Sequence, residues 1–97
     1  MTDFNPTHYD GLKLILFKCA HSEAATEEEV MCDLGAVEMP RRQGDLLAFV
    51  AANPEVETIE RAMLKLGATK YKVGDEQCVK LYWADGPVIL SSIGEKK

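Results

Sequence analysis

The chain has 97 residues, of which 46% are hydrophobic and 28% are charged, a balance typical of one globular domain over residues 1–97. No apolar run approaches the ~18–20 residues that span a bilayer, so no membrane partner is expected. The three cysteines have irregular spacing and the N-terminus has no signal-peptide core, so we expect a reducing, cytoplasmic setting.

Charge is distributed unevenly along the chain, whose net charge is −5. Residues 1–38 carry eight acids and two bases, whereas residues 39–97 carry eight acids and nine bases. A nucleic-acid contact would therefore come from a local patch in the second half. The acidic first half would face water or a basic protein surface.

The first predicted element follows a short tail at residues 1–7 and spans Tyr9 to His21. Its apolar residues have helical spacing: Leu12, Ile15, Leu16 and Cys19. The run Leu-Ile-Leu-Phe within it also favours a β-strand. The pattern therefore leaves helix and strand both open for residues 12–19.

A second helix is predicted from Thr26 to Leu34. Thr26 and Glu29 have the spacing of a capping box, in which each side chain binds a backbone amide of the other residue. Gly35 then ends the helix.

Two further helices are predicted on either side of an Asn53-Pro54 pair. The apolar cluster in Asp45–Ala52 indicates one of them, and Asn53-Pro54 is a favourable start for the next. The second has one apolar stripe and ends at Gly67. The stripe consists of Val56, Ile59, Met63 and Leu66.

After Gly67 the period of the pattern changes from 3.6 to 2. Thr69–Val73 and Val79–Trp83 alternate around a turn at Gly74–Gln77, which predicts a β-hairpin with Trp83 in the core. Val88–Leu90 could add a third strand. The expected fold is thus α+β: three to four helices in residues 8–66, then an antiparallel hairpin or three-strand meander in residues 69–92, and a frayed tail at 94–97.

The order of these elements from Asp45 to Trp83 resembles the winged helix-turn-helix superfamily, and is similar to small winged domains of phage and plasmid replication proteins. The resemblance rests on two stretches, Thr58–Val73 and Val79–Trp83. It implies a recognition helix before the hairpin and a wing formed by the hairpin. A small regulatory or accessory protein that contacts nucleic acid, or a nucleic-acid-processing complex, is the expected function.

The resemblance implies one contact surface formed by the recognition helix and the solvent face of the wing. Arg61 would contact a guanine edge and Lys65 a phosphate. The wing would add a basic strip with one aromatic ring. Its members are Lys70, Lys72, Lys80 and Tyr82.

The alternative function is that of a small acidic adaptor or inhibitor, of the kind that phages make, without any nucleic-acid contact. Its binding residues would be Glu27, Glu28 and Asp33, which would face a basic protein surface and could mimic nucleic acid there. A protein partner is expected in either case.

No pattern in the sequence indicates catalysis, a cofactor or a small-molecule substrate. The residues that could bind a soft metal lack the spacing of a zinc knuckle. These residues are His8, Cys19, His21, Cys32 and Cys78. No metal, cofactor or enzymatic activity is therefore expected.

Overall fold

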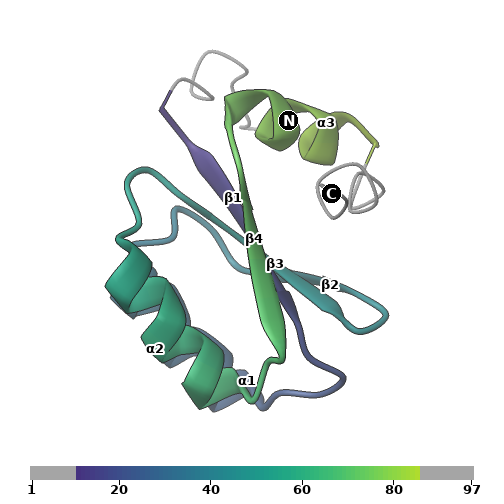
Figure 1. Ribbon diagram of the computed structural model, residues 1–97. Helices are drawn as coiled ribbons and strands as arrows, with labels where there is room; N and C mark the ends of the chain where they lie inside the picture. Colours follow the sequence, from purple (N-terminus) through teal and green to yellow (C-terminus); the bar gives the residue numbers. More distant parts are fainter. Residues whose placement is uncertain (1–10, 86–97) are drawn as a thin grey trace.

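Helices and strands alternate along the chain instead of forming separate halves. The computed structural model describes residues 11–85, which form β1 (Lys13–Lys18), α1 (Ala24–Leu34), β2 (Arg41–Gln43), β3 (Leu46–Ala51), α2 (Val56–Leu66), β4 (Lys70–Gly74) and α3 (Glu76–Asp85) (Figure 1). The predicted order, a helical N-terminal part followed by a winged-helix-like hairpin or meander, is therefore wrong.

The strands form one four-stranded sheet in the order β2-β3-β1-β4, and every neighbouring pair is antiparallel. With the two helices that connect the strands, this is the split β-α-β, or ferredoxin-like, arrangement, to which α3 is added. Figure 1 shows α1 and α2 together on one side of the sheet and α3 on the other.

The two central strands are covered on both faces, which explains their sequences. In β1, Ile15 and Phe17 pack in a cluster with residues of α1 and α2, whereas Leu14 and Leu16 pack in a second cluster with residues of α3. A strand buried on both faces is continuously apolar and shows no alternation. For this reason the predicted helix over Asp45–Ala52 is wrong, and the strand alternative holds for β1.

Helices α1 and α2 occupy the two predicted helical segments, although Val56 of the predicted α2 stripe is exposed, and Gly35 and Gly67 end them in the left-handed conformation, with φ of 70° and 72°. Their starts differ from the prediction. The N-cap residues are Glu23 and Glu55, and neither makes a side-chain cap hydrogen bond. Thr26 therefore lies within α1, and the predicted capping box is absent.

The second strand of the predicted hairpin is instead helix α3. The Asp75 carboxylate accepts hydrogen bonds from the backbone N–H groups of Gln77 (3.0 Å) and Cys78 (3.4 Å), which caps the start of the helix. Val79 and Tyr82, three residues apart on one helical face, are both buried. Of the two stretches on which the winged-helix resemblance depended, Thr58–Val73 forms a helix and a strand as expected, whereas Val79–Trp83 is helical and is not the second strand of a wing.

Several sequence predictions lie outside the residues that the structure describes. These are the tails at 1–7 and 94–97, the third strand at Val88–Leu90 and the position of the Trp83 side chain.

Candidate functional site

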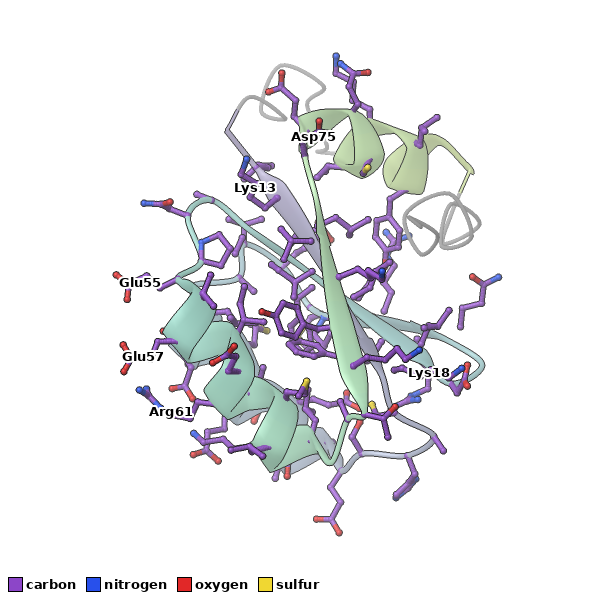
Figure 2. All side chains as sticks on the ribbon, in the orientation of Figure 1. Lys13, Lys18, Glu55, Glu57, Arg61 and Asp75 are labelled. Carbon is purple, nitrogen blue, oxygen red and sulfur yellow. The ribbon has the colours of Figure 1, made fainter. Side chains whose placement is uncertain are left out.

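Acidic and basic residues are segregated between the layers of the fold. The four strands together carry six bases and no acid. In contrast, α1 and α2 with their N-cap residues carry eight acids and two bases. Figure 2 shows Lys18 on the side of the sheet opposite to Glu55 and Glu57. The sheet therefore presents positive charge on the side away from α1 and α2.

Strand register places four of the six bases on that side. Lys72 lies opposite Leu16, and Arg41 lies opposite Ala48; both apolar partners belong to the cluster that packs against α3. Residues directly opposite each other share a face of the sheet. Lys18 and Lys70 are opposite each other and follow the same alternation along β1 and β4. We call Lys18, Arg41, Lys70 and Lys72 the basic sheet face.

These bases lie in two rows that cross all four strands. The residues of the outer row are Gln43, Leu46, Lys18 and Lys70, and those of the next are Arg41, Ala48, Leu16 and Lys72. Adjacent strands are about 4.8 Å apart, so the backbones of Arg41 and Lys72 are separated by about 14 Å. In the second row, the two cations lie at the ends and the apolar residues lie between them.

Helix α3 covers the apolar part of this face and leaves the bases at its margin. Val79 and Tyr82 pack on the inner rows of the sheet, among Leu14, Leu16, Ala48 and Val50. The Arg41 guanidinium lies 5.3 Å from the centre of the Tyr82 ring, a cation–π distance. Lys18, Arg41 and Lys70 are exposed and Lys72 is half-buried.

Acidic side chains near the basic sheet face balance only part of its charge. Lys18 and Asp45 form an ion pair of 3.7 Å in which both side chains are 51% exposed, a weak interaction in water. Burial raises the pKa of the Glu38 carboxyl, and the positive charge of Arg41 opposes this shift. Lys70 and Lys72 form no ion pair with any residue from 11 to 85. The two β4 lysines therefore remain available to an anionic partner.

The predicted contact residues do not come together on one surface. Arg61 is exposed on α2, 4.0 Å from Glu57, and Lys65 bridges to α1 through Glu29 (2.9 Å) and Asp33 (2.7 Å). Hydrogen bonds to these carboxylates raise the pKa of the Lys65 ammonium. Both bases thus lie in the acidic helical layer, away from the basic sheet face.

Of the residues assigned to the wing, only Lys70 and Lys72 share a face. Lys80 is exposed on α3, and Tyr82 is buried beneath that helix and is not on a solvent face. The basic strip expected from strand alternation is wrong here, because residues 76–85 are helical.

The residues of the alternative acidic surface also have different surroundings. Glu27 accepts a hydrogen bond from the Ser22 hydroxyl (2.6 Å) and lies 3.8 Å from Arg42, while Asp33 binds Lys65. Glu28 is exposed and forms no ion pair with the described part of the chain. Two of the three acids thus help to hold α1 in place.

Sequence reasoning missed Lys18 and Arg41 as members of the site. Lys18 follows the apolar run of β1 directly, so the strand alternative for residues 12–19 would have placed it on the face of Leu14 and Leu16. Arg41 had no comparable signal, because β2 consists of only three residues, all polar and exposed.

Comparison with known proteins adds no relative: no protein-family model, curated protein or solved structure matches this chain. Within residues 11–85, no helix is long and apolar enough to cross a membrane.

Proposed function

We propose that this chain is a small cytoplasmic accessory or regulatory protein that contacts the phosphate backbone of nucleic acid through the basic sheet face. The observation that carries the proposal is the segregation of charge. All six charged residues of the strands are basic, and four of them share the face away from α1 and α2. A local basic surface on an acidic chain is what a backbone contact requires.

The pair Lys18 and Lys70 supports an anionic ligand. Two like charges directly opposite each other in a sheet destabilise it, and Lys72 lies diagonally across from Lys18 on the same face. An anion bound between these ammonium groups would remove the repulsion. Phosphates bound along this face by lysine and arginine would do so without reading the bases.

The acidic helical layer supports a single orientation on the ligand. Carboxylates on α1 and α2 are repelled by phosphates, whereas the basic sheet face on the opposite side of the sheet attracts them. The protein would therefore approach nucleic acid with its sheet, and α1 and α2 would face outward.

The proposal is tested by titration of a random-sequence DNA duplex with the full chain at several salt concentrations. Contact with three or four phosphates predicts a slope of log K against log salt of about −3 to −4. A double variant, Lys18→Gln with Lys70→Gln, should bind every sequence more weakly. Its slope of log K against log salt should be less steep by about two. The matched control is Lys13→Gln with Arg61→Gln, which removes the same charge from the side of the sheet that carries α1 and α2.

The control variant should keep most of the affinity, because its two bases do not belong to the basic sheet face. Equal losses for the two variants would show that only net charge matters, and this result would refute the assigned surface. A wild-type chain without salt-dependent binding would refute the proposed function itself.

A second candidate is the acidic adaptor, which the eight acids and two bases of the α1 and α2 layer favour. Of its predicted contacts, Glu28 is the one exposed without an intramolecular ion pair among residues 11–85. Binding of a polylysine probe that Glu28→Gln weakens, with no binding of duplex DNA, would support this function instead.

A further inference from the structure

Strand β4 is an edge of the sheet, and within residues 11–85 no strand lies on its outer side. The direction of the backbone N–H and C=O groups of β4 follows from the hydrogen bonding of its neighbour, β1. The Cys19 N–H donates to the Asp45 carbonyl (2.8 Å) in register with the β1–β3 pairing, so the odd-numbered residues of β1 direct their backbone groups to β3. The even-numbered residues of β1, among them Lys18, then direct their backbone groups to β4.

The strand register shows which residues of β4 direct their backbone groups toward β1. Lys70 and Lys72 pair with even-numbered residues of β1, so their backbone groups point inward. The Lys18 carbonyl, which accepts from the Thr69 N–H at 2.9 Å, agrees with this direction. Tyr71 and Val73 therefore direct their N–H and C=O groups toward the open edge.

The side chains of β4 give this edge two different faces. Tyr71 and Val73 lie on the face of α1 and α2, where Tyr71 is half-buried and Val73 is 45% exposed. Lys70 and Lys72 lie on the basic sheet face with Lys18 beside them. An added strand would thus meet apolar side chains on one face and the ammonium groups of Lys70 and Lys72 on the other.

We propose that β4 binds an extended segment of a protein partner as a fifth strand, and that this segment alternates apolar and acidic side chains. The Tyr71 and Val73 backbones would supply the hydrogen bonds. Apolar residues of the segment would lie opposite Tyr71 and Val73, and carboxylates opposite Lys70 and Lys72, where cross-strand pairs of opposite charge are stabilising.

The lysines of β4 also disfavour other strands at this edge, including a second copy of the chain. In an antiparallel pair of two copies that uses both Tyr71 and Val73, Lys72 of one copy would lie opposite Lys72 of the other, which is unfavourable. Lysine on an edge strand similarly disfavours a neutral or basic strand. Acidic residues convert the same repulsion into attraction and so confer specificity.

The probe is a fluorescent synthetic peptide, Ser-Glu-Val-Glu-Val-Glu-Ser, and its control has the same composition in the order Ser-Glu-Glu-Glu-Val-Val-Ser. The full chain should bind the alternating peptide more tightly than the control, by about tenfold. Val73→Pro removes an outward N–H without removing a bond to β1, so it should abolish peptide binding. Val73→Thr keeps the N–H and should retain it.

Two further measurements keep the test independent of folding and of the proposed function. On peptide addition, hydrogen exchange of the Tyr71 and Val73 amides should slow in the wild-type chain. Val73→Pro should still bind duplex DNA, since every cation of the basic sheet face is present. Equal binding of the two peptides, unchanged amide exchange, or a dimer formed through this edge would each overturn the proposal.

Discussion

Lys18 and Lys70 lie directly opposite each other on neighbouring antiparallel strands, on the face of the sheet away from α1 and α2. Lys18 forms an ion pair with Asp45 at 3.7 Å, and both side chains of that pair are half exposed. A sheet selected only for stability would place an acid at one of these positions. The repulsion is therefore a structural cost at the surface that we propose for the phosphate contact.

Replacement of Lys70 by Glu is expected to separate stability from binding. The like-charge pair becomes an opposite-charge pair, which should stabilise the fold by about 0.2–1 kcal/mol. The same change should weaken duplex binding and make the salt dependence of the affinity less steep, because one phosphate contact is lost. Urea unfolding and the duplex titration measure the two effects. Lys80→Glu, an equal charge change on α3, is the control, and a similar gain in stability there would contradict the role of the Lys18–Lys70 pair.

Arg42 is expected to be structural although it lies beside Arg41 in the sequence. Its guanidinium donates to the Cys19 carbonyl and to the Ser22 hydroxyl, both at 2.7 Å, and so connects β2 to the segment between β1 and α1. Arg42→Ala should lower the free energy of unfolding by about 1.5–3 kcal/mol, as for hydrogen bonds to a charged group. Thermal or urea unfolding measures this loss.

Arg42→Lys serves as the matched variant, since it keeps the charge and loses the planar fork of donors. We expect it to recover only part of the lost stability. If it were as stable as the wild type, charge alone would explain the contribution of Arg42.

Tyr82 is expected to hold α3 on the sheet. Its side chain is 1% exposed and packs in the cluster with Leu14, Leu16, Ala48 and Val50. Tyr82→Ala should cost about 3–5 kcal/mol, the usual range for a large buried aromatic side chain. Leu81→Ala, on an exposed position of the same helix, should cost much less. Similar losses for the two variants would show that α3 packs in another orientation.

The sequence predicted the elements whose pattern depends on one buried face. Helix α2 shows this best, because Ile59, Ala62 and Leu66 are buried along one side while charged residues cover the rest. Its end at Gly67 was also correct. The start was not, because Asn53 and Pro54 precede an extended residue, Glu55, which is the actual N-cap.

The strands β1 and β3 could not be recognised in the same way. Helices cover both of their faces, so they have no alternation, and a short apolar run has the composition of a helix segment as much as of a strand. Helix α3 produced the opposite error. Val79, Leu81 and Trp83 alternate in the sequence, whereas the buried side of the helix is formed by Val79 and Tyr82.

The candidate site was predicted only in part, because local patterns cannot show which strands are neighbours in the sheet. Lys70 and Lys72 were expected on one face, and β4 confirms that they share it. The other two members of the basic sheet face, Lys18 and Arg41, lie on β1 and β2. Only the sheet order places β1 beside β4 and β2 beside β3. Such long-range pairing leaves no signal in local spacing, so no motif could have joined these residues.

The last prediction concerns the pH dependence of stability at Glu38. Burial raises the pKa of this carboxyl, and the charge of Arg41 lowers it to a smaller extent. A raised pKa means that the folded state binds the proton more readily than the unfolded state, so the carboxylate destabilises the fold once it ionises. Below the ordinary pKa of about 4.3, both states are protonated and this penalty is absent. The penalty appears as the pH rises through the raised pKa of the folded state.

Glu38→Gln should therefore match the wild type in stability at about pH 3, exceed it as the pH rises through the raised pKa of Glu38, and keep a constant advantage above that pKa. Urea unfolding of both proteins across this range measures the difference. In an Arg41→Gln background the difference should grow, because the charge that favours the Glu38 carboxylate is gone. A difference between Glu38→Gln and wild type that stays constant with pH would show that the carboxyl titrates alike in the folded and unfolded chain, and that its half-buried position beside Arg41 carries no net penalty.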